Sequence, residues 1–119
     1  HTNTVAAFHK AMAEIGVRGV VFCHLSHSYH SGACQYFTFA IADKSDNAMV
    51  TYDVAKRVLQ QSFMDNHGTV SHHHGVGRMM GPWMRSELGD TAHDLVLAIK
   101  DYLDPRGIMN PGGTLGLKR

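Results

Sequence analysis

The spacing of apolar residues changes along the chain and predicts both helices and strands. Between Asn3 and Ile15 apolar residues recur every three or four positions, which is the period of a helix, and Gly16 follows as a stop. Segments 17–28 and 33–42 are rich in β-branched and aromatic residues and are joined by a short link containing Gly and Ser. Two such runs predict an antiparallel hairpin.

Alternation along the second run assigns its side chains to two faces. The face that we expect to pack on helices carries Phe37, Phe39 and Ile41. The opposite face carries Cys34, Tyr36 and Thr38. Because this second face is more polar, we expect Tyr36 to look into a cavity.

The second half of the chain predicts further helices separated by a loop. Segment 48–66 reads as a helix that Gly68 would end, with an apolar stripe of Val50, Val54, Val58 and Phe63. A glycine-rich loop or short strand follows, then a short helical turn over 81–88 that begins with Gly-Pro. Segment 91–103 is a helix for which Thr91 is the expected cap, and Asp104-Pro105 stops it.

These elements predict one α+β domain in which helices cover a small antiparallel sheet, with 104–119 as an extended tail. Two strands form a marginal sheet alone. We therefore expect the sheet to continue with strands outside this chain or with a second copy, so a homo-oligomer is expected.

The net charge disfavours two classes of partner. The formal charge is +1, which argues against nucleic acid or an anionic membrane as the main partner because both select clustered Lys and Arg. Cys23 and Cys34 lie on the two paired runs and could face each other, but free thiols are the favoured interpretation. The one anomaly is the histidine content, 10 in 119 residues.

Three consecutive histidines, His72, His73 and His74, lie between glycines in TVSHHHGVG. A metal site is one interpretation, but neighbours in a strand point to opposite sides, so we predict no metal here. Histidines without a role are a second interpretation. The third is a polar cavity in which imidazoles donate to anionic oxygens or move protons, with Tyr36 as a proton acceptor if a cation lies nearby.

Three segments together resemble a known family: GACQYFTFA (32–40), GTVSHHHGVGRMMGPWMRSELG (68–89) and IKDYLDPRGIMNPG (99–112). They are similar to the C-terminal part of the FAD-linked oxidases typified by vanillyl-alcohol oxidase. The LDPRGIMNPG ending is shared with the 2-hydroxy-acid dehydrogenases of that family. The unbroken SHHHGVG with GACxYF resembles the alkyldihydroxyacetonephosphate synthase branch more specifically.

The resemblance implies a substrate (cap) domain that covers the flavin of FAD. It implies exchange of the acyl chain of acyl-dihydroxyacetone phosphate for a long-chain alcohol, without net redox chemistry. Tyr36 matches the tyrosine that accepts and donates a proton at the substrate carbon, and His72, His73 and His74 match a triplet required for activity. The residues that the resemblance places next to the cofactor are His73, His74, Gly75 and Asn110.

The family's glycine-rich diphosphate-binding segment does not occur in this sequence, so we expect the FAD-binding domain to be absent from it. The remaining FAD-binding portion of the same protein is then the expected partner, and the chain alone should neither bind FAD tightly nor turn over. Two alternatives stay open, an FAD-linked oxidase or dehydrogenase of a 2-hydroxy acid or alcohol, and a histidine-rich metal-binding module. The expected location is a microbial cytoplasm, with peripheral membrane attachment as an alternative.

Overall fold

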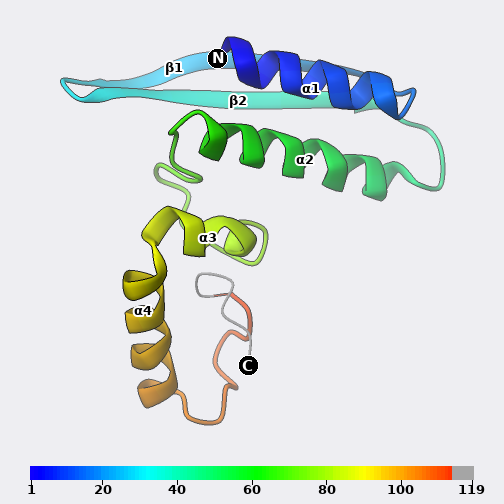
Figure 1. Ribbon diagram of the computed structural model, residues 1–119. Helices are drawn as coiled ribbons and strands as arrows, with labels where there is room; N and C mark the ends of the chain where they lie inside the picture. Colours follow the sequence, from blue (N-terminus) through cyan, green and yellow to red (C-terminus); the bar gives the residue numbers. More distant parts are fainter. Residues whose placement is uncertain (114–119) are drawn as a thin grey trace. The chain divides into compact units, whose positions relative to one another are not determined.

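The computed structural model describes residues 1–113, and the chain divides into two compact units after Asn66. The elements of the first unit are α1 (Thr2–Glu14), β1 (Arg18–Tyr29), β2 (Gly32–Ala42) and α2 (Ala48–Asp65). Those of the second are α3 (Gly81–Leu88) and α4 (Asp90–Leu103) (Figure 1). Helices with one antiparallel sheet confirm the α+β class.

Strands β1 and β2 form a two-stranded antiparallel sheet with a tight connection at residues 30–31. The register shifts between Leu25 and His27, so Ser26 is an extra residue in β1. Cys23 pairs with Phe37, whereas Cys34 pairs with His27. Because Phe37 and Cys34 are three positions apart, the two cysteines lie on opposite faces of the sheet. The expectation that they could face each other is wrong, and both are free thiols.

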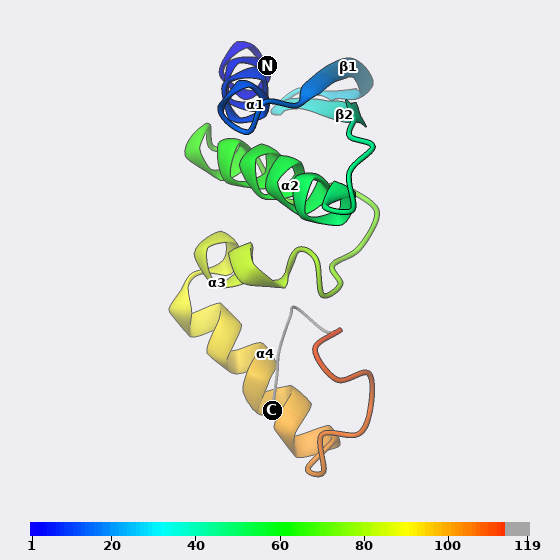
Figure 2. The ribbon, with the colours of Figure 1, turned by 90° about the vertical axis from the view of Figure 1, so that its right-hand side faces the viewer.

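The core of the first unit lies between α1, α2 and one face of the hairpin. Its buried apolar side chains are Phe8, Ala11, Met12, Ala55 and Leu59. Phe39 and Ile41 pack against this cluster, and the ring of Phe37 lies 5.2 Å from that of Phe63. Figure 2 shows α1 and α2 next to each other with the hairpin alongside. The face of β2 predicted to pack on helices is therefore confirmed.

The predicted apolar stripe of α2 is confirmed in part. Val54, Val58 and Phe63 pack against the core, whereas Val50 is 62% exposed. The buried positions of α2 are Thr51, Ala55, Leu59, Gln60 and Ser62. The buried hydroxyls have polar partners: Ser62 lies 3.0 Å from Thr4 on α1, and Thr51 donates to Asp43. Hydrogen-bonded hydroxyls can be buried at little cost, which is why the apolar pattern alone did not predict the burial of these two residues.

The end of α2 also differs from the prediction. The helix ends at Asp65, and His67, rather than Gly68, adopts the left-handed conformation with φ of 59°. Histidine is one of the residues that tolerates this conformation.

In the second unit, α3 and α4 meet at Gly89, whose φ is 77°. Arg85 of α3 donates to the carboxylates of Asp90 and Asp94, at 2.7 Å each. The expected cap, Thr91, is wrong: Gly89 is the cap residue, and Asp90 supplies the negative charge of the first turn.

The apolar face of α4 is exposed, with Leu95, Ile99 and Leu103 more than half accessible. Asp104 ends this helix, as predicted. Residues 104–113 form turns, and the rest of the predicted tail lies outside the described residues. Among the helices described, none has the length and apolar character required to cross a membrane.

Candidate functional site

Tyr36 lies half-buried on β2, on the face away from the helical core. Its partner across the sheet is His24, and the two ring centroids are 5.2 Å apart with planes inclined by 30°. Sequence analysis did not single out His24 as a neighbour of Tyr36. Without the extra residue at Ser26, Leu25 would stand opposite Tyr36, and nothing in the sequence indicates that bulge.

The histidine triplet lies on a bend in the loop between α2 and α3. The hydroxyl of Ser71 donates to the carbonyl of Gly75 at 3.1 Å and closes this bend around His72, His73 and His74. Gly75 has φ of 70°, a conformation that other residues rarely adopt. The sequence predicted a loop or short strand here, and the structure shows a loop.

The three imidazoles form one cluster. Nδ1 of His72 and Nδ1 of His73 are 2.8 Å apart, and the rings of His73 and His74 meet edge to face with centroids 4.1 Å apart. The expectation that neighbours point apart assumed a strand and is wrong for a bend. A hydrogen bond between two ring nitrogens needs one donor and one acceptor, so His72 and His73 share a single proton along it.

Glu87 of α3 anchors the start of this loop. Its carboxylate accepts from the hydroxyl of Thr69 and from the main-chain N–H of Val70, at 2.5 and 3.2 Å. Val70 is buried, only 5% exposed. Sequence analysis missed Glu87, since one acidic residue on a short helix carries no signal of its partner.

Asn110 lies in the turns after α4 and has φ of 46°. The N–H of Gly113 donates to its carbonyl at 2.9 Å. The turn also contains Asp104, which is buried and accepts from Lys100 and from the N–H groups of Ile108 and Met109. The hydrogen bond from Lys100 is the main cause that lowers the pKa of Asp104 below its ordinary value.

The predicted residues are thus distributed over the two units. Tyr36 belongs to the first unit, and the triplet, Gly75 and Asn110 belong to the second. The structure brings His72, His73 and His74 together, whereas a joint site of Tyr36 with the triplet stays a prediction.

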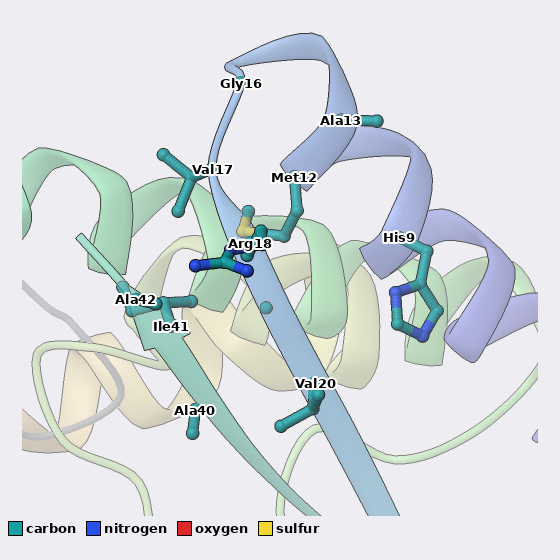
Figure 3. A pocket seen from close by; sticks show the side chains of 11 residues that line it. His9, Met12, Ala13, Gly16, Val17, Arg18, Val20, Ala40, Ile41 and Ala42 are labelled. Carbon is teal, nitrogen blue, oxygen red and sulfur yellow. The ribbon is translucent and has the colours of Figure 1, made fainter.

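A hollow of about 780 Å³ lies in the first unit between the end of α1 and the start of the hairpin (Figure 3). Its lining is mostly apolar, including Met12, Val20 and Ile41, with His9 and Arg18 as polar side chains. Tyr36 does not line it, so this hollow is separate from the predicted chemistry.

The match to known proteins covers nearly the whole chain. Residues 2–114 match the family model described as "FAD linked oxidases, C-terminal domain". The chain belongs to this family. FAD is accordingly the cofactor of the proteins in which this domain occurs.

Several curated relatives are similar to this FAD-linked oxidase domain. An alkyldihydroxyacetonephosphate synthase of Trypanosoma brucei brucei is 34% identical over 92% of the chain, and one of Dictyostelium discoideum is 33% identical over 87%. Glycolate oxidase subunit GlcD of Bacillus subtilis is 28% identical over 92%. The chain spans only 18%, 17% and 23% of the lengths of these three proteins, respectively.

Proposed function

We propose that this domain is the C-terminal catalytic part of an FAD-dependent enzyme that exchanges the acyl group of acyl-dihydroxyacetone phosphate for an alkyl group. The observation that carries the proposal is the cluster of three imidazoles on the Ser71–Gly75 bend. The similarity to two synthases over most of the chain supports it.

The chemistry of the side chains fits the roles proposed for them. Deprotonation next to a carbonyl needs a positioned base, and we assign this proton transfer to Tyr36. A departing carboxylate and a substrate phosphate need hydrogen-bond donors, which the N–H groups of the triplet would supply. Because the rings of the triplet are exposed, a ligand can reach them.

The cofactor contacts proposed for this chain are limited to one part of FAD. His73, His74, Gly75 and Asn110 offer imidazole, main-chain and amide groups, which suit the polar edge of a flavin ring. FAD, when bound, would supply the electron-accepting ring beside the reacting carbon. The described residues offer no comparable set of groups for the diphosphate and adenosine, so the rest of the protein would bind these.

A second candidate is dehydrogenation of a 2-hydroxy acid or a related alcohol by the same FAD. The similarity to a glycolate oxidase subunit over 92% of the chain favours it. In this case Tyr36 or the triplet would take the hydroxyl proton of the substrate.

The two candidates differ in whether the flavin changes its redox state. Full-length protein, freed of oxygen, would be mixed first with 2-hydroxy acids and then with acyl-dihydroxyacetone phosphate and a long-chain alcohol. Bleaching of the flavin by a 2-hydroxy acid supports the dehydrogenase. Formation of the alkyl product without any electron acceptor supports the synthase, and its absence with well-loaded FAD contradicts that proposal.

A third candidate, a histidine-rich metal-binding module, is tested by zinc calorimetry. Tight stoichiometric binding that disappears when His72, His73 and His74 are replaced would favour the module over the enzyme. The further proposals are a homo-oligomer in a microbial cytoplasm, with peripheral membrane attachment as an alternative. Size-exclusion chromatography with light scattering tests the oligomer, and fractionation of cells tests the location.

A further inference from the structure

We infer that Lys100 and Asp104 are positioning residues that hold Asn110 in place for its contact with FAD. The inference rests on the proposed role of Asn110 at the cofactor and adds the residues that make that role possible. Its evidence is the hydrogen-bond network of the turn that follows α4.

Asp104 is buried although it lies in a turn. It is 6% exposed, and its carboxylate accepts from Nζ of Lys100 and from the N–H groups of Ile108 and Met109, at 3.1 and 2.9 Å for the main-chain pair. One carboxylate thus binds both the end of α4 and the far side of the turn. Residues 105–107, which lie between, are closed into a loop by the N–H of Gly107, which donates to the carbonyl of Asp104 at 2.9 Å.

Lys100 also binds the main chain of Met109, the residue before Asn110. Its ammonium also donates to the carbonyl of Met109 at 2.8 Å, while Asp104 holds the N–H of the same residue. Both main-chain polar groups of Met109 are therefore fixed by one ion pair. These hydrogen bonds fix the main chain directly before Asn110, whose φ is 46°.

Gly113 limits the position of Asn110 from the other side. Its N–H donates to the Asn110 carbonyl, and a Cβ atom built at position 113 would overlap with the side-chain amide of Asn110. The amide therefore lies directly over the Cα of Gly113. A side chain at position 113 would therefore displace the Asn110 amide.

Stability alone does not account for this network. Ile108 and Met109, which it holds, are 58% and 65% exposed, so the turn buries little apolar surface. Burying an ion pair costs desolvation that often cancels its attraction, so a gain in stability does not by itself explain the pair. A turn that is held rigidly and packs little suits a residue that must meet a ligand at a fixed position.

The test measures FAD binding to the apo form of the full-length protein by flavin fluorescence. Asn110→Ala should weaken binding about tenfold, the effect of losing one hydrogen bond with good geometry. Asp104→Asn, Lys100→Met and Gly113→Ala should each weaken it by a similar factor. The double variant Asp104→Asn/Asn110→Ala should bind no more weakly than Asn110→Ala alone, because both changes remove the same contact.

Arg85→Gln is the matched control, since it breaks two exposed ion pairs of the same unit, with Asp90 and Asp94, that lie away from this turn. It should leave FAD binding unchanged. Thermal unfolding of each apo variant separates lost folding from lost positioning, and Gly113→Ala repeats the test with the ion pair intact. If the two losses of FAD affinity multiply in the double variant, or if Asp104→Asn binds FAD unchanged, the positioning role is overturned while the proposed contact of Asn110 stands. Unchanged binding in Asn110→Ala overturns the proposed cofactor contact itself.

Discussion

The histidine triplet concentrates three imidazoles in a single bend, and their mutual contacts limit what they can do. Because Nδ1 of His72 faces Nδ1 of His73 at 2.8 Å, only one of these two atoms can carry the proton between them. His73 also contacts His74, so it is the central member of the cluster. Replacing His73 would therefore remove a ring contact from both neighbours.

We expect Tyr36→Phe and His73→Gln to reduce turnover far more than stability. Each keeps the approximate shape of the side chain but removes a proton-transferring group, a loss of about 100-fold or more in rate for general acid–base catalysis. The measurement compares kcat of the full-length enzyme with its Tm. His9→Gln, a change on the exposed side of α1, is the control and should alter neither. Equal losses of kcat and stability would contradict a catalytic role.

Substitution of Gly75 tests whether turnover depends on the conformation of the Ser71–Gly75 bend. A Cβ atom at this position would meet no atom within 4 Å, so Gly75→Ala introduces only the strain of φ at 70°, about 1–2 kcal/mol. Relaxing that strain would open the Ser71–Gly75 bend, and we expect kcat to fall at saturating FAD. Gly77→Ala, with equal space and no positive φ, should behave like the parent. Matching kinetics for the two variants would show that the bend is not required.

Asp104 links stability to pH with a definite sign. Hydrogen bonds, first of all from Lys100, lower its pKa in the folded state, so it stabilises the fold above the unfolded pKa of about 3.9. This contribution disappears as the pH falls through the lower, folded pKa. The stability difference between the parent and Asp104→Asn should therefore be constant near neutrality and shrink below about pH 4. Urea unfolding at a series of pH values measures it, and a difference independent of pH would contradict the ion pair.

At the scale of elements, the approach of α1 to β1 depends on a residue without a side chain. A Cβ atom at Gly19 would lie 2.9 Å from Phe8 and 3.1 Å from Met12, both fully buried. We expect Gly19→Ala to lower the free energy of unfolding by about 1–3 kcal/mol through overpacking. Gly32→Ala, which meets nothing within 4 Å, is the control and should cost much less. Chemical denaturation measures the free energy of unfolding of the two variants. Equal values would contradict the close contact of Gly19 with Phe8 and Met12.

The same elements show what sequence can and cannot predict. The helices, the hairpin and the inward face of β2 follow from apolar periodicity, because burying those faces is what drives the elements together. Apolar periodicity did not predict that the hydroxyls of Thr51 and Ser62 are buried. Polar residues are buried only where hydrogen-bond partners on other segments satisfy them. The periodicity did not predict the pairing of His24 with Tyr36 either, because this pairing depends on the bulge at Ser26.

The candidate residues were found from the sequence, but their geometry was not. Periodicity has no meaning in the loop of the triplet, where Ser71, Gly75 and Glu87 set the conformation through individual hydrogen bonds. Strand geometry predicts that neighbouring histidines point apart, which is wrong for the bend that this loop forms. Hydrogen bonds between individual loop residues form only in the folded chain, so the sequence pattern does not predict them.

At the scale of the whole molecule, we expect the chain to contribute a small share of the cofactor contacts of its family. It spans less than a fifth of each synthase to which it is similar. Its proposed contacts with FAD are confined to one bend and one turn, both on the surface of the second unit. Binding a ligand as large as FAD tightly needs a site that buries most of the ligand's surface.

We therefore predict that the isolated 119-residue chain binds FAD only weakly, whereas the full-length protein binds it tightly. Titration of the chain into FAD should leave the flavin fluorescence unchanged at concentrations that saturate the full-length apoprotein. Adding the remaining portion of the protein as a separate polypeptide should restore binding, because the missing diphosphate and adenosine contacts then return. A preparation of the chain alone that stays yellow through gel filtration would contradict this division of the cofactor site.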